Sequence, residues 1–463
     1  MREVRVVLIS TYELGRQPFG LASPAAWLQA TGAAVTCCDL AVAPLDGRAI
    51  ASADLVAFHV PMHTATRLAI AAVDQVRQLD PRAHLCFYGL YAPMNEAYLR
   101  SLGARTILGG EFEAGLASLV RRLAAGGDAA SPGAQAEPVV SLARQDFLVP
   151  DRTGLPDLRR YARLDMGTGE ERTAGYTEAT RGCKHRCRHC PIVPVYGGRF
   201  RVVPRDVVLE DVRRQVEAGA RHITFGDPDF FNGPGHALPL VAALHARWPH
   251  VTYDATIKIE HLLRHRRHLA TLRDTGCLFV TSAVESIDAR ILEIFDKRHT
   301  REDFLEVVAL FRDLGLALNP TFVTFTPWTT LRGYRELLAL LAELDLVDHV
   351  APIQYAIRLL VPAGSRLLDV PGVREALGAF DAALLCYPWS HPDPRVDRLY
   401  DGVLRAVKEG QRRHESRHET FARIWEVASA ADAAAAAPLP RDAWAHDRAL
   451  RAPIPRMTEP WFC

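Results

Sequence analysis

Short apolar segments alternate with amphipathic segments along residues 1–125. The segments Val4 to Ile9, Leu55 to Val60 and His84 to Tyr88 consist mainly of apolar residues, which is typical of parallel strands covered on both faces. Between two of them, Ala65 to Leu79 repeats its apolar positions at the helical period, which predicts an amphipathic helix. Because βαβ crossovers are right-handed, this alternation predicts a doubly wound parallel sheet.

A second pattern begins at residue 175, where a strand followed by a helix recurs six times. Such units predict a partial (β/α)6 barrel over residues 175–368, with Val350 to Leu360 as its last strand. A stretch rich in Ala, Gly and Pro within residues 126–174 predicts a linker. Residues 369–463 are expected to form a mainly helical extension with a proline-spaced tail. The whole chain is therefore expected to have an α/β fold.

Three local expectations follow from the same patterns. Ser23 is expected to be the N-cap of a helix over Pro24 to Ala30. In the extension, helices are expected over Asp381 to Leu385 and over Arg398 to Val427.

Composition and charge restrict the classes of partner. Lys+Arg 55 against Asp+Glu 54 gives a formal net charge of +1, which removes the overall positive field that nonspecific nucleic-acid or membrane binding needs. No apolar run reaches the roughly 18 to 20 residues of a membrane span. The N-terminal segment Met1 to Ser10 is too short for a signal peptide and has no cleavage site after it. With 49% hydrophobic residues in 463, we expect two or three domains in a cytoplasmic protein.

Three of the nine cysteines have the spacing of cluster ligands. Cys183, Cys187 and Cys190 form a C-x3-C-x2-C motif directly after the first strand of the predicted barrel. Three thiolates on one tight loop can each bind one iron of a [4Fe-4S] cluster and leave the fourth iron open. A structural zinc site completed by His185 or His189 is the alternative. The other internal cysteines are expected in the core, namely Cys37, Cys38, Cys86, Cys277 and Cys386.

Basic residues surround this motif. Positive charges near a thiol favour its thiolate form, so they are expected to lower the pKa of the three cysteines and to offset the negative charge of a cluster. These residues are Arg181, Lys184, Arg186 and Arg188.

The segment from Arg181 to Pro191 resembles the signature of the radical S-adenosylmethionine superfamily, and the resemblance covers roughly Gly175 to Leu368. It implies an enzyme in which the open iron holds the amino and carboxylate groups of S-adenosylmethionine. One electron from the cluster then cleaves the sulfonium to a 5′-deoxyadenosyl radical, which takes hydrogen from a substrate. The resemblance also implies a small-molecule substrate and an electron donor such as flavodoxin or ferredoxin. From the net charge and the lack of a long apolar run, no membrane or nucleic-acid partner is expected.

The same resemblance implies roles for residues near the strand ends. His189 stands where the family usually has an aromatic residue, and its ring would lie against adenine. Gly226, Asp227 and Asp229 occupy the motif that binds the methionine amino group, and Glu285 would hold the ribose hydroxyls. For the three acidic residues the alternative is a helix N-cap or a capped strand end.

A doubly wound domain ahead of such a barrel resembles the cobalamin-binding domain of one branch of the superfamily. Where a cobalt-ligating histidine would stand in an Asp-x-His-x-x-Gly motif, Ser10 to Arg16 contains none. Some members lack this histidine, so cobalamin is left open as a third cofactor. If it binds, methyl transfer to an unactivated carbon or phosphorus is the favoured reaction. The alternatives are a cobalamin-independent rearrangement, sulfur or selenium chemistry, or a non-enzymatic scaffold stapled by zinc.

The tail from Pro453 to Cys463 resembles a radical S-adenosylmethionine family named for a Cys followed by Cys or selenocysteine and Ala-Glu-Pro. The printed sequence ends where the second of these residues would come, so we hypothesise an in-frame UGA codon read as a stop. The nucleotides after codon 463 test this. Cys463 is a candidate catalytic residue, with an inert thiol as the alternative. Trp461 and Phe462 are expected to dock near a cleft.

Overall fold

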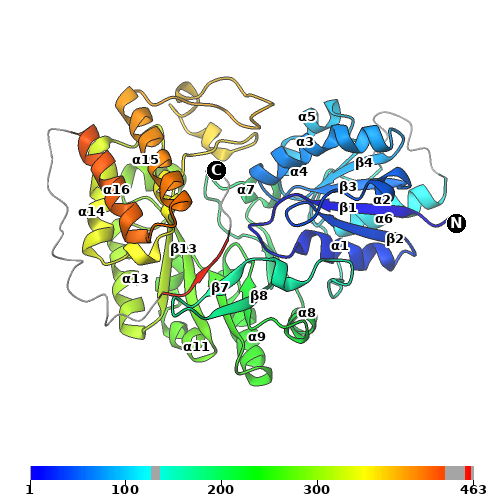
Figure 1. Cartoon of the computed structure of the whole chain (residues 1–463), viewed down its shortest axis with the longest axis horizontal. Helices are drawn as coiled ribbons and strands as arrows, with labels where there is room; N and C mark the ends of the chain where they lie inside the picture. The colour runs from blue at the N-terminus through cyan, green and yellow to red at the C-terminus, as the bar shows by residue number, and fades with distance from the viewer. Residues whose placement is uncertain (1, 127–135, 433–453, 460–463) are drawn as a thin grey trace.

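The computed structural model describes residues 2–126, 136–432 and 454–459. Two sheets organise it, and Figure 1 shows them side by side, with the first sheet in blue and the second in green. The long helices α15 and α16 lie on the side of the second sheet that is remote from the first. No helix within the described residues is long and apolar enough to span a membrane.

The first sheet confirms the predicted doubly wound fold. Its strands are parallel and have the order β2-β1-β3-β4-β5-β6. Alternate residues of β1 pack on opposite faces, against α2, α3 and α5 on one face and against α1 and α6 on the other. The strands are β1 (Arg5–Ser10), β2 (Ala34–Asp39), β3 (Leu55–His59), β4 (His84–Tyr88), β5 (Thr106–Gly110) and β6 (Val140–Ser141). The helices are α1 (Phe19–Gln29), α2 (Gly47–Ala51), α3 (His63–Leu79), α4 (Tyr91–Met94), α5 (Glu96–Ser101) and α6 (Glu113–Ala124).

Helix α1 begins earlier than predicted, and Ser23 is not its N-cap. Its first residue is Phe19, so Ser23 lies inside the helix and donates a hydrogen bond to Oε1 of Glu113 at 2.7 Å. Pro24 has no N–H to bond the carbonyl of Gly20 one turn earlier. The hydroxyl of Tyr88 donates to that carbonyl instead, at 2.8 Å, so the helix tolerates the proline.

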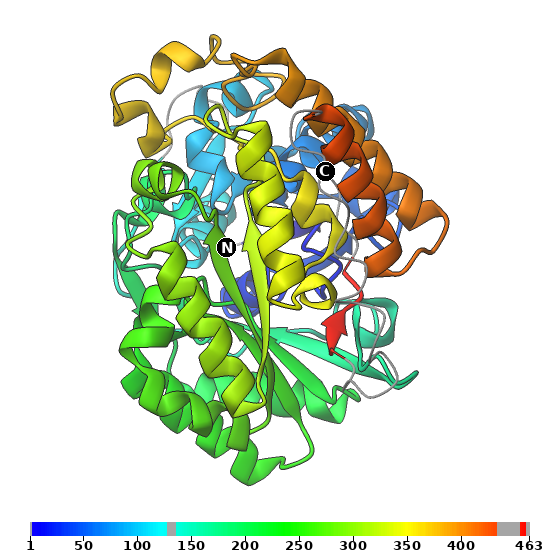
Figure 2. The ribbon, with the colours of Figure 1, turned by 90° about the vertical axis from the view of Figure 1, so that its left-hand side faces the viewer.

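The second sheet is the predicted partial barrel, and Figure 2 shows its strands beside the green and yellow helices that cover them. Its order is β14-β13-β12-β11-β8-β7-β15, with β8 to β14 parallel and the edge strands β7 and β15 antiparallel. The strands are β7 (Arg163–Asp165), β8 (Glu171–Thr177), β11 (His222–Phe225), β12 (Thr252–Thr256), β13 (Cys277–Glu285), β14 (Ala317–Phe322) and β15 (Arg456–Met457). A separate pair comprises β9 (Thr180–Gly182) and β10 (Phe200–Val202).

The prediction of a sixth barrel strand over Val350 to Leu360 is wrong. Pro352–Ala356 form a 3-10 turn, and Arg358 alone makes a parallel bridge, to Phe325. Pro352 has no N–H for a strand ladder, so the sheet closes no further at this edge. The helices of this part are α7 (Ile192–Tyr196), α8 (Arg205–Glu217), α9 (Pro234–Arg247), α10 (Ile259–Arg264), α11 (Leu269–Asp274), α12 (Ala289–Phe295), α13 (Arg301–Leu314) and α14 (Leu331–Glu343).

The extension contains two helices where one was predicted, α15 (Pro394–Arg412) and α16 (Arg417–Ala431). Ser416 and Glu419 form a capping box that starts the second helix, which explains the break. The expected helix at 381–385 is wrong, since Asp381 and Cys386 pair in an antiparallel bridge around a turn.

The segment predicted as a linker contributes to both sheets. Strand β6 adds to the first sheet beside β5, and β7 with the start of β8 belongs to the second sheet. Strand β6 is the edge strand of the first sheet, and β7 lies between β8 and the edge strand β15 of the second.

Candidate active site

The cysteine triad lies in the loop between β9 and α7. Gly182, the last residue of β9, has φ 72°, and a Cβ at this position would lie 2.4 Å from Cδ1 of Tyr196. Only glycine combines a left-handed backbone with so close an approach. The end of α7 therefore packs back onto the start of the cysteine loop.

The three thiols lie near one another. Cys183 and Cys187 are buried, and Cys190 is partly exposed. Burial, together with the neighbouring thiols of Cys187 and Cys183, raises the pKa of the Cys190 thiol to about 12. Iron binds the thiolate, so loading a cluster must release protons from these side chains. Three clustered thiols fit a [4Fe-4S] cluster in which one iron has no protein ligand.

The two histidines that could complete a zinc site contact carboxylates instead. Nε2 of His185 lies 3.2 Å from Oδ2 of Asp229, and Nε2 of His189 lies 3.1 Å from Oε1 of Glu285. Across the described residues, the one set of His, Cys, Asp and Glu donors tight enough for a single metal ion contains no cysteine. The geometry therefore does not support a zinc staple built on the triad.

The expectation that flanking cations lower the thiol pKa values is wrong for Cys183 and Cys190, because burial raises both. Arg181 pairs with glutamates, and Arg188 donates to the carbonyl oxygens of Glu293 and Ile294. These cations are therefore committed to other partners.

Two lysines from other segments take the place of the flanking cations. Lys258, which precedes α10, donates from Nζ to Sγ of Cys187 at 3.6 Å. Lys297, which follows α12, lowers the pKa of Cys190 against the effect of burial. Both lysines are distant from the motif in sequence, so local spacing gave no signal for them.

His189 and Glu285 come together at the end of β13. The ring of His189 stacks on Phe295, with centroids 4.3 Å apart, and Nζ of Lys297 lies 3.3 Å from Oε1 of Glu285. Burial alone would raise the pKa of Glu285, but Lys297 and His189 outweigh it and lower this pKa to about 2. Glu285 also has φ 67°, which is unusual for a non-glycine residue. The adenine and ribose roles of this pair stay predictions.

Gly226 and Asp227 fix the end of β11 against the segment that precedes the cysteine loop. A Cβ on Gly226 would lie 1.8 Å from the hydroxyl oxygen of Tyr176, so no side chain fits there. The carboxylate of Asp227 accepts hydrogen bonds from the N–H of Ala179 at 2.9 Å and the hydroxyl of Thr180 at 2.5 Å. Burial outweighs these bonds and raises the pKa of Asp227 to about 7.

Asp229 is oriented away from Asp227. Its Oδ1 accepts a hydrogen bond from the N–H of Phe231 at 3.2 Å, which is the N-cap contact expected as the alternative role. Its Oδ2 lies 2.7 Å from Nδ1 of His261 and 3.2 Å from Nε2 of His185. The structure thus places Asp229 beside the cysteine loop, with its carboxylate turned toward two histidines.

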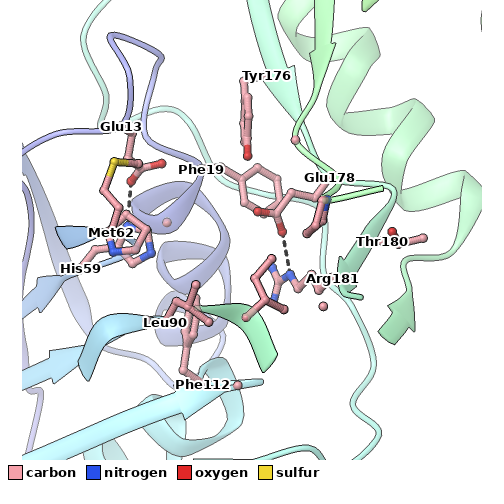
Figure 3. Close-up of a pocket in the computed structure, with 18 of the residues that line it drawn as sticks. Glu13, Phe19, His59, Met62, Leu90, Phe112, Tyr176, Glu178, Thr180 and Arg181 are labelled. Atoms are coloured by element: carbon pink, nitrogen blue, oxygen red, sulfur yellow. Dashed lines mark hydrogen bonds and ion pairs between the residues drawn. The ribbon is translucent and has the colours of Figure 1, made fainter. Parts of the chain in front are cut away.

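A cavity of ≈ 1010 Å³, its open mouth included, lies between the carboxyl ends of the two sheets. This is the edge at which ligands of parallel sheets bind. In Figure 3, Glu13, His59 and Met62 of the first sheet's loops lie across the cavity from Tyr176, Glu178 and Arg181. Both sheets therefore contribute to one pocket, and Gly182 at the start of the cysteine loop lines it as well.

Two ionic groups line this cavity, and the smaller is a Glu13–His59 pair. Oε1 of Glu13 lies 2.8 Å from Nδ1 of His59. A Cβ on Gly20 would lie 1.9 Å from the His59 ring, so glycine makes room for the imidazole. The local sequence gave no signal for this pair, because Glu13 follows β1 and His59 ends β3. His63, nearby, bonds the carbonyl of Leu384 at 2.7 Å.

The larger group is centred on Arg181, which is 7% exposed. Its guanidinium lies 2.6 Å from Glu113 and 3.6 Å from Glu111, both of the first sheet, and 2.8 Å from Glu178 of the second. Burial raises the pKa of Glu111 and of Glu178 to about 7, although Arg181 opposes the shift. The buried guanidinium of Arg181 therefore forms ion pairs at the cavity wall with glutamates from beside both sheets.

The described part of the tail reaches the same cavity. Strand β15 pairs with β7, and Glu459 forms an ion pair with Arg16. Arg16 lines the cavity, and its guanidinium lies 5.1 Å from the ring centroid of Tyr176. The predictions for Trp461, Phe462 and Cys463 concern residues outside the described part of the chain.

The second part of the chain is similar in sequence to a known family. Residues 177–341 match the family profile of the Radical SAM superfamily. The tRNA-2-methylthio-N(6)-dimethylallyladenosine synthase of Chlorobium chlorochromatii is 28% identical over 218 residues, which cover 44% of this chain and 46% of that protein. Hopanoid C-3 methylase of Methylococcus capsulatus is 28% identical over 233 residues, which cover 48% and 43%. The match thus spans less than half the length of these curated relatives.

Comparisons of structure cover both sheets. The cobalamin-dependent S-adenosylmethionine radical enzyme OxsB, with aqua-cobalamin and S-adenosylmethionine bound, aligns with a TM-score of 0.69 at 13% identity over 90% of this chain and 72% of that chain. The radical S-adenosylmethionine methyltransferase TsrM of Kitasatospora setae, with cobalamin and a [4Fe-4S] cluster bound, gives 0.56 at 18% identity over 74% and 70%. The family match implies a [4Fe-4S] cluster and S-adenosylmethionine as cofactors. Residues 177–341 therefore form a radical SAM domain, within a fold that the chain shares with these two enzymes.

Proposed function

We propose that this chain is a radical SAM enzyme that modifies a small molecule, with cobalamin in the cavity between the two sheets and methyl transfer as its reaction. In this proposal Cys183, Cys187 and Cys190 hold a [4Fe-4S] cluster that reductively cleaves S-adenosylmethionine. The observation that carries the proposal is the position of the cysteine loop. It begins at Gly182, on the wall of a cavity that both sheets line at their carboxyl ends.

The residues around the loop support cluster binding. Lys258 donates to Cys187, and a donor to a cluster ligand stabilises the more negative, reduced cluster. Asp227 bonds to Ala179 and Thr180, which holds the start of the loop against β11. Burial of the thiols excludes water from the site, and electrostatic interactions are stronger in such a site. The chain's own part is therefore to hold three thiolates beside the cavity.

The cavity has features that suit a large planar cofactor. Apolar side chains of Phe19, Met62, Leu90 and Phe112 line it on the side of the first sheet. Gly110 has φ 71°, and a Cβ there would lie 2.2 Å from the carbonyl oxygen of Ser141, so the end of β5 presents bare backbone. When bound, cobalamin supplies a transferable methyl group, and the Glu13–His59 pair would face it as a polar contact.

A specific observation also supports a second candidate, sulfur or selenium chemistry by Cys463. The tail pairs along β7 and reaches Arg16 on the cavity wall four residues before that cysteine. In this case Cys463→Ser should abolish product formation and leave cleavage of S-adenosylmethionine intact. If product forms at the wild-type rate in that variant, this second candidate is rejected.

The test of the main proposal is anaerobic incubation with S-adenosylmethionine and reductant, with and without cobalamin, followed by mass analysis. Formation of 5′-deoxyadenosine by the reconstituted protein is the result expected of the class. S-adenosylhomocysteine that appears only with cobalamin would support methyl transfer. The control is a Cys190→Ala variant, which should form neither product. If the two cobalamin conditions give the same products, the methyl-transfer part is rejected.

A further inference from the structure

A second group of donor side chains lies beside the cysteine triad and contains none of its cysteines. His185 comes from the cysteine loop, Asp229 follows β11, and His261 lies in α10. Oδ2 of Asp229 is 2.7 Å from Nδ1 of His261 and 3.2 Å from Nε2 of His185, and these three atoms all lie within 4.8 Å of one another. The side chains of His185, Asp229 and His261 are 8%, 0% and 0% exposed. Three segments distant in sequence therefore converge on one enclosed point.

The directions of these three atoms distinguish the group from an ordinary hydrogen-bonded network. None of the three has a hydrogen-bond partner among the described residues, although their separations would allow one. An imidazole N–H aimed at a carboxylate oxygen 2.7 Å away would form a strong hydrogen bond. These three atoms lie close together but form no hydrogen bonds with one another. Ligand atoms around a shared metal ion have this arrangement. A buried polar atom without a partner destabilises the folded state, so these atoms favour a ligand at their centre.

The surroundings favour a cation at that centre. The other oxygen of Asp229 is engaged by the N–H of Phe231, which fixes the carboxylate with Oδ2 free for a ligand. Oε2 of Glu260 lies 3.7 Å from Nδ1 of His185, the ring nitrogen on the far side from Asp229, and 3.8 Å from Nζ of Lys258. A carboxylate behind a ligating histidine is the usual arrangement around a bound metal, since it orients the ring.

We propose that His185, Asp229 and His261 bind a single divalent transition-metal ion, separate from the cluster. Two imidazole nitrogens and one carboxylate oxygen suit zinc or ferrous iron. The ion would join the cysteine loop, at a position between Cys183 and Cys187, to the ends of β11 and α10. It would thereby fix the part of the loop that carries the first two thiols. The inference does not depend on the proposed function, because none of its three ligands is a cysteine of the triad.

The test uses the full-length chain without its competing thiols. A Cys183→Ser, Cys187→Ser, Cys190→Ser variant is stripped with chelator and dialysed anaerobically against Zn²⁺, Fe²⁺ or Co²⁺ in separate arms. Metal analysis should find about one ion per chain, and Co²⁺ should give visible d–d bands that report nitrogen and oxygen ligands. The Zn²⁺ and Fe²⁺ arms show which ion is held more tightly. Less than about a tenth of an ion per chain in every arm would overturn the proposal.

Two further variants assign the ligands. His261→Gln in the same background should lose the ion, with at least a tenfold weaker affinity, and Asp229→Asn should weaken it similarly while keeping the side chain's shape. The matched control is His265→Gln. The ring centroid of His265 lies 5.6 Å from that of His261, but His265 is not one of the three proposed ligands. This variant should bind the ion as tightly as the parent variant does. Circular dichroism of each variant confirms folding. Equal binding by folded His261→Gln and His265→Gln would overturn the assignment.

Discussion

Arg181→Met removes a buried charge that pairs with glutamates beside both sheets and leaves the hydrophobic part of the side chain. Burial would raise the pKa of Glu113, but Arg181 and hydrogen bonds from Gln145 and Ser23 lower it. Without Arg181, that carboxylate is buried unpaired, and breaking such a pair costs about 3–5 kcal/mol. We therefore expect the free energy of unfolding to fall by about 3–5 kcal/mol at pH 8.

The loss should depend on pH in a defined direction. In the variant, only the hydrogen bonds from Gln145 and Ser23 still oppose burial. We therefore expect the folded-state pKa of Glu113 to rise above its unfolded value, so that the folded state binds a proton that the unfolded state has lost. Stability then falls as the pH rises toward the folded-state pKa, by about 1.4 kcal/mol per pH unit for one proton. The destabilisation at pH 6 should therefore be smaller than at pH 8.

Urea unfolding followed by circular dichroism at pH 6 and pH 8 measures both quantities. The matched control is Arg159→Met, because Arg159 is paired with Asp157 on the surface with its side chain 73% exposed. Such a pair contributes little to stability, because water and ions screen it. A loss below about 1 kcal/mol for Arg181→Met, or an equal loss at the two pH values, would show that the buried network does not work as described.

Three further predictions concern single side chains near the site. Lys258→Met removes the donor to Cys187, so the reduction potential of the reconstituted cluster should fall, which a redox titration measures; an unchanged potential would contradict the contact. The pKa of Glu285 is lowered to about 2, so its ionised form contributes fully to the free energy of unfolding above about pH 4.5. This contribution is lost as the pH falls toward 2, and the stability of Glu285→Gln should therefore fall less steeply with pH over this range. His59→Gln should weaken cobalamin binding about tenfold in equilibrium dialysis, whereas His63→Gln, a change of the neighbouring loop histidine, should not.

The elements that could be predicted from sequence are those fixed by local periodicity. The unbroken apolar run of β4 (His84–Tyr88) and the helical repeat of α3 (His63–Leu79) are buried as their patterns indicate. The start of α1 could not be predicted, because Tyr88 compensates for Pro24 from a distant strand. The absence of a sixth strand follows from the turn at Pro352.

In the candidate site too, local spacing could be predicted from the sequence and tertiary contacts could not. The spacing of Cys183, Cys187 and Cys190 predicts one loop, and the structure brings the three thiols together. Lys258 could not be found, because its contact with Cys187 depends on how β12 is placed beside the loop. The proximity of His185 to His261 could not be predicted for a related reason, since His261 lies in α10, distant from the cysteine loop in sequence. Tertiary contacts of this kind leave no periodic signal in the sequence.

The central claim is that Cys183, Cys187 and Cys190 hold a cluster with one iron open to S-adenosylmethionine. Mössbauer spectroscopy of protein reconstituted anaerobically with isotopically enriched iron tests it directly, with spectra recorded before and after addition of S-adenosylmethionine. The account predicts about four irons per chain in the cluster, one of which changes its isomer shift when the ligand is added. Spectra that remain identical, or an absence of cluster iron, would contradict the account.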